Sequence, residues 1–82
     1  MITWEMFVEL IRSQIPNREL AESVEILSET RLIEDLEYDS IAIIELLAQI
    51  EEDYGVDITT HPDFAVRFNV CKDIYEEIQE ML

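Results

Sequence analysis

The pattern of apolar and polar positions along the chain predicts helices. Apolar residues recur at helical spacing over positions 6–11, and Thr3 stands where an N-cap would begin a helix at Trp4. Pro16 should end this helix near Ile15, because the residue before a proline avoids helical dihedral angles. No stretch alternates apolar and polar residues with the period of two that marks a half-buried strand. The pattern therefore predicts an all-α chain.

A long connection follows the first helix, from Asn17 to Tyr38. It contains apolar anchors but no glycine, and beyond a turn or two it shows neither a clean helical nor a strand period. A connection of this length inside a small domain is normally packed down or functional. We expect an ordered loop that crosses the bundle and delivers Asp39 and Ser40 to the start of the next helix.

The next helix is predicted from Ser40 to Tyr54, with Gly55 ending it. A helix packed on one side of a small domain should have a polar half, but this helix is apolar around nearly its whole circumference. We assign one face to the core, formed by Ile43, Leu46, Leu47, Ile50 and Tyr54. We assign the other face to solvent and partners, formed by Ile41, Ile44 and Ala48 among Glu45, Gln49 and Glu52. Two apolar faces imply a second occupant, either another protein or a guest admitted by the core.

The C-terminal third predicts a short helix starting near Pro62 and a last helix from Val70 to Met81, with Asn69 as its N-cap. Residues 1–82 should form one domain. The expected fold is a small bundle of three main helices plus one short helix, with a long loop after the first helix.

The composition of the chain limits the kinds of partner that it can bind. The formal net charge is -15, yet 49% of the residues are hydrophobic, which indicates a folded domain because disorder combines high charge with low hydrophobicity. Such a chain repels nucleic acid and anionic membrane surfaces and attracts basic protein patches. Positions 32–66 contain ten acidic residues and no Lys or Arg, so the negative field is concentrated around Ser40.

Other chemistry finds little support in the sequence. Asp35, Glu37 and Asp39 imitate the start of a calcium loop, but Ser40 stands where that loop needs glycine, so we expect no metal site. A hydrolytic site would have to pair Ser40 with His61, the only histidine, and we expect no catalytic residues. The single cysteine and the lack of a signal peptide or transmembrane span favour a cytoplasmic protein, and we expect a monomer.

Ser40 admits two interpretations. Ser and Asp are both favoured at helix N-caps, so Asp39 and Ser40 could serve only to start a helix. A serine hydroxyl exposed at a helix N-terminus is also well placed to carry a phosphodiester, because backbone N–H groups and the helix dipole favour a phosphate there.

The stretch around Ser40 resembles the acyl carrier protein family. The likeness rests on Asp39-Ser40-Ile41 in place of the family's D-S-L, followed by an amphipathic helix that ends in an acidic cluster. It is strongest over positions 32–56 and extends to the order of helices along most of the chain.

The resemblance implies that Ser40, preceded by Asp39, carries a 4′-phosphopantetheine arm whose thiol holds acyl groups as thioesters. A phosphopantetheinyl transferase would install the arm from coenzyme A. The other partners would be acyl-transfer and condensing enzymes with basic docking patches. In family terms the helix after Ser40 docks these enzymes, here through Ile41, Ile44, Glu45, Ala48, Glu51 and Glu52. The acyl chain would be held by some combination of Ile43, Leu47, Ile58 and Phe64.

The chain departs from the family at three positions. Glu37 and Tyr38 replace the glycine and small residue that often precede the aspartate, and Ala42 stands where fatty-acid carriers commonly have an acidic residue. We interpret Ala42 as one lost docking carboxylate. The pathway stays open between fatty-acid and polyketide-type biosynthesis. The alternatives are an aminoacyl or peptidyl carrier, and an acidic helical adaptor in which Ser40 is only a cap.

Overall fold

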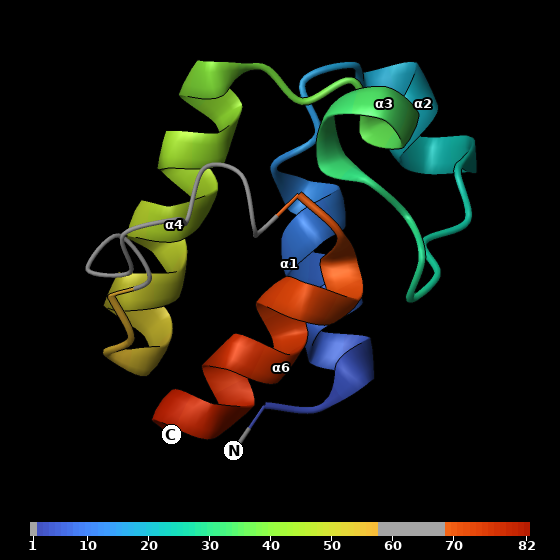
Figure 1. Cartoon of the computed structure of the whole chain (residues 1–82). Coiled ribbons are helices and arrows are strands. Elements are labelled where there is room, and N and C mark those ends of the chain that lie inside the picture. Colours follow the sequence, from blue (N-terminus) through green and yellow to red (C-terminus); the bar gives the residue numbers. More distant parts are fainter. Residues whose placement is uncertain (1, 58–68) are drawn as a thin grey trace.

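The structure is a computed structural model that describes residues 2–57 and 69–82. In these ranges the chain is helical and contains no strand, which confirms the all-α prediction. The three main helices are α1 (Trp4–Ser13), α4 (Ser40–Tyr54) and α6 (Cys71–Met81), as Figure 1 shows. Two short helices lie between α1 and α4, namely α2 (Arg18–Ser23) and α3 (Leu32–Leu36). The short helix predicted near Pro62 falls outside the described residues.

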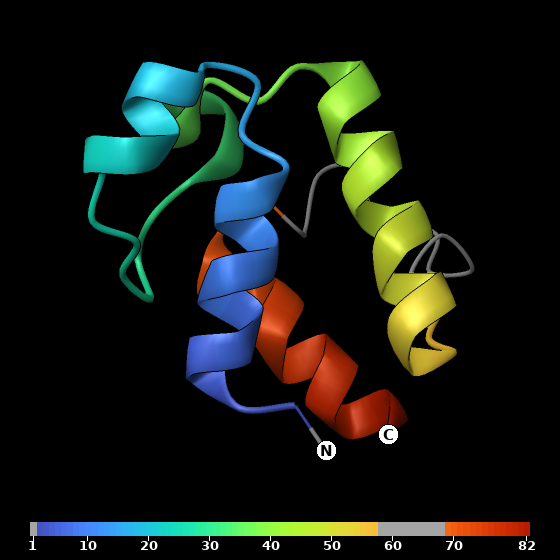
Figure 2. The same cartoon turned by 180° about the vertical axis from the view of Figure 1, so that it is seen from behind.

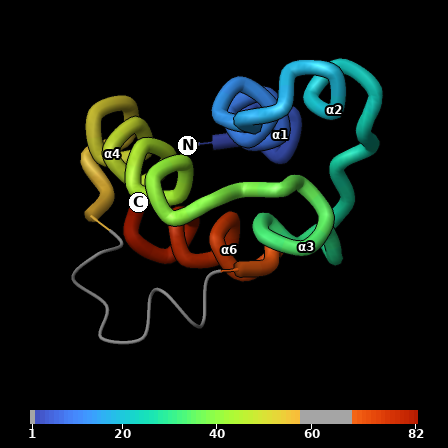
Figure 3. The backbone as a smooth tube through the Cα atoms, turned by 90° about the horizontal axis from the view of Figure 1, so that it is seen from above, coloured from blue at the N-terminus to red at the C-terminus, as the bar shows by residue number. Residues whose placement is uncertain are grey.

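The first helix begins as predicted, because Thr3 Oγ1 accepts a hydrogen bond from the Met6 N–H at 3.2 Å. It ends at Ser13, slightly before the predicted limit near Ile15. Views from the front and from behind both place α1 beside α6 (Figures 1 and 2). Seen from above, α4 stands on one side of this pair and the connection carrying α2 on the other (Figure 3). The core between them includes fully buried side chains from each main helix, among them Phe7, Ile11, Leu46, Ile50, Ile74 and Ile78.

The long connection is more helical than its pattern predicted. Asn17 caps α2, since its side-chain oxygen accepts from the N–H groups of Glu19 and Leu20. Helices of five or six residues do not form alone, because nucleation costs more than so few hydrogen bonds return. Packing stabilises these two instead: Ala21 of α2 and Leu32 and Leu36 of α3 are buried.

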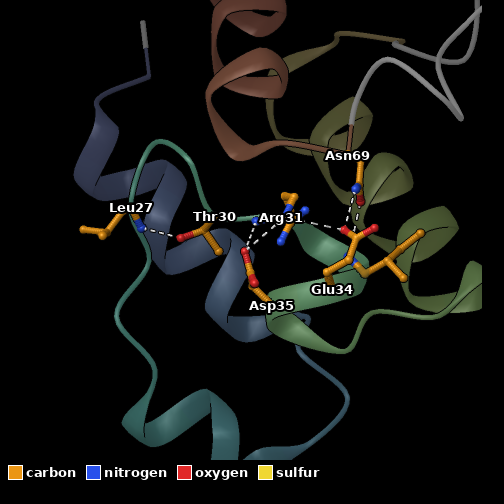
Figure 4. Close-up of polar contacts among 7 residues, drawn as sticks. Leu27, Thr30, Arg31, Glu34, Asp35 and Asn69 are labelled. Atoms are coloured by element: carbon orange, nitrogen blue, oxygen red, sulfur yellow. Dashed lines mark hydrogen bonds and ion pairs between the residues drawn. The ribbon is translucent and has the colours of Figure 1, made fainter.

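Asn69 joins α3 to the start of α6, as Figure 4 shows. Its side chain accepts from the Ile33 N–H at 3.2 Å and donates to Glu34 Oε2 at 2.8 Å. The bond from Asn69 lowers the pKa of the Glu34 carboxyl. The prediction that Asn69 caps the last helix is therefore wrong: α6 begins at Cys71, and its cap position makes no side-chain hydrogen bond. Asn69 instead holds the connection in place beside α6.

The residue that ends α3 has an unusual backbone. Glu37 adopts a left-handed conformation with φ 57°, and it is the one non-glycine residue with positive φ in the described ranges. A Cβ atom in this conformation costs on the order of 1 kcal/mol, which glycine avoids. The sharp change of direction at Glu37 is what turns the chain from α3 toward Ser40.

We expect Glu37→Gly to stabilise the fold by about 0.5 kcal/mol or less, because the left-handed strain of about 1 kcal/mol is relieved but the added freedom of the unfolded chain offsets at least half of it. Urea unfolding followed by circular dichroism measures this gain. Glu37→Ala keeps the Cβ atom and removes the charge, so it serves as the matched control and should show no comparable gain. A loss of stability in Glu37→Gly would contradict the assignment of strain to this residue.

Candidate functional site

The segment that leads into α4 places its side chains alternately inside and outside. Leu36 and Tyr38 are buried, whereas Glu37, Asp39 and Ser40 are exposed. Tyr38 is the inner anchor: its hydroxyl donates to the backbone oxygen of Ile11 in α1 at 2.7 Å. Burial, and then the neighbouring Cys71, raises the pKa of the Tyr38 hydroxyl, so it remains a protonated donor at neutral pH. A buried anchor two residues upstream therefore fixes the direction in which Ser40 leaves the core.

Ser40 is the first residue of α4 and Asp39 is its cap. One carboxylate oxygen of Asp39 accepts from the Ala42 N–H at 2.7 Å, and the Asp39 backbone oxygen accepts from the Ile43 N–H at 3.0 Å. The helix is therefore started by Asp39, which leaves the Ser40 side chain without a capping role. Within the described residues, no acceptor or donor engages the Ser40 hydroxyl.

The other serines differ from Ser40 in this respect. Ser13 donates to the Leu10 oxygen at 2.7 Å and Ser23 to the Glu19 oxygen at 3.1 Å, both within their own helices. Ser28 donates to a carboxylate oxygen of Glu29 at 2.7 Å. Ser40 thus combines an exposed hydroxyl free of such local bonds with a place at the N-terminus of a helix of 15 residues.

The exposed face of α4 contains all six predicted docking residues. Its two isoleucines are the most exposed large apolar side chains in the described ranges, since Ile41 is 66% and Ile44 is 64% exposed. The remaining four are also exposed, namely Glu45, Ala48, Glu51 and Glu52. On the opposite face, Leu46, Leu47 and Ile50 are buried, and Ile43 and Tyr54 pack half-buried against the core. The division of α4 into two faces matches the predicted one.

Ala42 belongs to the buried face. It is 5% exposed and lies in the core cluster. Ala42 thus lies at the start of the buried face of α4. That a docking carboxylate is lost at position 42 stays a prediction.

Of the four residues predicted to hold an acyl chain, the structure describes two. Leu47 is buried and Ile43 is half-buried on α4, where both adjoin the core. Ile58 and Phe64 fall outside the described residues, as does His61. The acyl site thus stays a prediction that rests on two neighbouring positions of α4.

Comparison with known families identifies the chain. The family described as "Phosphopantetheine attachment site" matches residues 9–68, a span that includes Ser40 and most of the structure described above. The chain belongs to this phosphopantetheine-attachment family. This membership confirms the predicted cofactor, covalently attached 4′-phosphopantetheine.

The phosphopantetheine-attachment domain also has relatives among curated proteins. It is 38% identical over 55 residues to the acyl carrier proteins of Rickettsia canadensis (strain McKiel), Rickettsia rickettsii (strain Iowa) and Rickettsia prowazekii (strain Madrid E). The aligned part covers 67% of this chain and 62% of each relative's length. No solved structure gave a significant match. These similarities confirm the resemblance to acyl carrier proteins.

The residues at the head of α4 fit the attachment of a phosphate group. The Ser40 hydroxyl of the phosphopantetheine-attachment domain is exposed, and the first-turn N–H groups of Ser40 and Ile41 have no acceptor among the described residues. A helix N-terminus with free N–H groups favours a phosphodiester. Asp39 keeps its carboxylate on the Ala42 N–H and so leaves these two donors available.

Cys71 is the chain's own thiol and is fully buried at the start of α6. Burial, and then the charge of Asp35, raises the pKa of the Cys71 thiol to about 12. Because the thiolate is the reactive form, this thiol is nearly inert in the folded phosphopantetheine-attachment domain at pH 8.

We expect the folded chain without its arm to resist iodoacetamide at pH 8 and to react fully in 6 M guanidinium chloride. The physical reason is that alkylation requires both access to the thiol and its deprotonation. Intact mass spectrometry over time measures the reaction. Fast alkylation without denaturant would show that Cys71 is accessible. If the expectation holds, labelling of the folded protein reports the thiol of the arm alone.

Within residues 2–57 and 69–82, the phosphopantetheine-attachment domain has no helix that combines the length and the apolar character needed to cross a membrane.

Proposed function

We propose that this domain is a non-catalytic carrier that holds acyl intermediates on 4′-phosphopantetheine attached to Ser40. One observation carries the proposal: Ser40 is an exposed serine, unbonded within the described residues, at the head of a long helix in a chain of the phosphopantetheine-attachment family. The curated relatives are named acyl carrier proteins, which supports a carrier of acyl groups over an enzyme.

The chain's own residues prepare Ser40 for modification. Tyr38 is bonded to α1 and fixes the segment from inside, while Asp39 starts the helix and holds its first turn. Ser40 Oγ would form the bond to phosphorus while the diphosphate bond of coenzyme A breaks, so that adenosine 3′,5′-bisphosphate leaves and the hydroxyl proton passes to a base of the transferase. The N–H groups at the first turn of α4 would favour the attached phosphate. When bound, the arm supplies a thiol that forms thioesters with acyl groups.

Partner enzymes would dock on the exposed face of α4. Ile41 and Ile44 offer apolar contact close to Ser40, and Glu45 adds a negative charge beside them. Apolar anchors inside an acidic surface suit an enzyme with a basic rim, because charges speed the encounter and desolvated side chains supply affinity. The proposed partners are a phosphopantetheinyl transferase and acyl-transfer or condensing enzymes, in the cytoplasm.

The proposed pathway is fatty-acid or polyketide-type biosynthesis. The strong negative charge and the Asp39-Ser40 pair favour acyl over aminoacyl or peptidyl cargo. Loading of the modified chain with malonyl or aminoacyl donors separates the two classes. The adaptor alternative uses the same exposed face of α4, but it assigned Ser40 a capping role that Asp39 fills instead.

Incubation with coenzyme A, Mg²⁺ and a broad-specificity transferase tests the proposal. The intact mass should rise by one phosphopantetheine group, and the modified chain should then accept an acyl group that hydroxylamine removes. An unmodified mass under conditions that convert a known carrier protein would overturn the proposal.

The docking face can be tested separately from the attachment. We expect Ile44→Ala to lower kcat/KM of the transferase about tenfold, because truncation of a central apolar contact removes roughly 1–2 kcal/mol of binding. Glu45→Lys should lower it further and weaken its dependence on salt. Leu27→Ala is the matched control, since Leu27 is 49% exposed but lies in the connection across the bundle from α4 (Figures 3 and 4). Equal effects of Ile44→Ala and Leu27→Ala would contradict docking through α4.

A further inference from the structure

An open cavity lies on the surface formed by the start of α1, the turn at Ser28 and Glu29, and the first half of α6. Its volume is about 580 Å³, which falls in the size range of ligand pockets. None of the residues assigned to docking or to acyl binding lines it. The Ser28–Glu29 turn and α4 lie on opposite sides of the bundle in the front and top views (Figures 1 and 3).

Aromatic side chains line the cavity, and contacts within the chain fix their positions. Trp4 and Tyr75 pack edge to face with ring centroids 5.2 Å apart, and Phe7 supports both rings from the core at 5.4 Å. The Tyr75 hydroxyl donates to the Ile2 backbone oxygen at 3.3 Å. Trp4 and Tyr75 nevertheless remain partly exposed, and Val70 adds an aliphatic wall. The structure thus presents preformed aromatic surface at a partly open site.

The rim of the cavity carries charge. Glu29 and Glu76 contribute carboxylates and Lys72 contributes an ammonium group, and all three side chains are exposed. The Ser28 hydroxyl, and to a smaller extent Lys72, lowers the pKa of Glu29. The Glu29 carboxylate therefore already interacts with groups of this chain. Glu76 has no hydrogen bond or ion pair with another described residue. The net charge of the rim is therefore negative, and Glu76 is the rim carboxylate that has no partner among the described residues.

We propose that this cavity binds an arginine side chain of a partner protein. A guanidinium group stacks on aromatic faces and pairs with a carboxylate in the same plane, and its aliphatic stem suits an apolar wall. Trp4 and Tyr75 supply aromatic rings at right angles to each other, Val70 the wall and Glu76 the carboxylate. The net charge of -15 favours a basic partner over an acidic one.

The cavity lies far enough from α4 to bind a partner independently of the proposed docking face. Because it lies across the bundle from α4, a partner could hold the domain there while Ser40 and the face of α4 remain accessible. The inference does not depend on the proposed carrier function, since it uses no residue of α4.

The test uses Trp4, the chain's single tryptophan, as its own reporter. The probe is a blocked Gly-Arg-Gly peptide, compared with the same peptide containing citrulline, a neutral isostere, in 0.15 M salt to screen the general field. We expect saturable change of Trp4 fluorescence with the arginine peptide and binding at least about tenfold weaker with the citrulline peptide. Glu76→Gln should weaken binding of the arginine peptide several-fold, and Lys72→Ala should strengthen it.

Glu80→Gln is the matched control, because Glu80 is an exposed carboxylate of α6 that does not line the cavity. It should leave the affinity unchanged. Equal binding of the two peptides, equal effects of Glu76→Gln and Glu80→Gln, or no fluorescence response would each overturn the proposal. All three substitutions fall on exposed side chains, so circular dichroism should show an intact fold in each variant.

Discussion

Ser40→Ala is expected to take up no phosphopantetheine, which is the largest effect of any single substitution in this chain. The substitution removes the only atom that can form the proposed phosphodiester. The Ser40 hydroxyl is exposed and makes no hydrogen bond with a described residue, so stability should change by less than about 0.5 kcal/mol. Intact mass after treatment with transferase and coenzyme A measures the uptake, and urea unfolding measures the stability.

Ser23→Ala provides the matched control for this loss. Ser23 is also an exposed helical serine, but it lies at the end of α2 and donates to the Glu19 oxygen. The control variant should be modified like the unaltered chain. A phosphopantetheine adduct on Ser40→Ala would place the attachment elsewhere. Loss of modification in both variants would indicate damage to the fold rather than removal of the acceptor.

Local patterns predicted the parts of the fold that local chemistry determines. Thr3 caps α1 and Gly55 ends α4 with φ 70°, because both roles depend on the residue itself and its nearest neighbours. The division of α4 into buried and exposed faces followed from helical spacing alone. Ser40 lies at the head of α4 for the same reason, since the capping preference of Asp39 can be read directly from the sequence.

Long-range contacts determine what the sequence did not reveal. Asn69 was predicted to cap the last helix, but Glu34 of α3, 35 positions earlier, offers it a carboxylate beside the start of α6. The short helix α3 depends on the burial of Leu32 and Leu36 and has no strong start signal of its own. For α2 a signal existed, since Asn17 follows a proline and precedes a run of good helix formers.

The backbone conformation explains how this chain departs from the family at positions 37 and 38. The family often has glycine where this chain has Glu37, and Glu37 indeed adopts the left-handed conformation that glycine favours. The next residue compensates in part. Tyr38 fills space in the core and adds a hydrogen bond to α1 where the family often has a small residue. Strain at Glu37 and anchoring at Tyr38 together define how Ser40 is presented.

Tyr38→Ala is therefore expected to destabilise the fold by about 3–5 kcal/mol, the range seen when a buried aromatic side chain is truncated. Tyr38 is 3% exposed, so the cavity left behind would open between α1 and the segment that leads to Ser40. Urea unfolding measures the loss. Amide exchange at Ala42 and Ile43, whose N–H groups are bonded to Asp39, should accelerate more than exchange in α6, because the anchor is local to the head of α4.

Tyr38→Phe separates packing from hydrogen bonding. It keeps the ring and removes the donor to the Ile11 oxygen, which still accepts from the Gln14 N–H at 3.2 Å. Because that oxygen retains a partner, the loss should be only about 1 kcal/mol. Transfer of phosphopantetheine to Tyr38→Phe should remain close to that of the unaltered chain. A loss as large as that of Tyr38→Ala would show that the hydroxyl, rather than the packed ring, holds the Ser40 segment against α1.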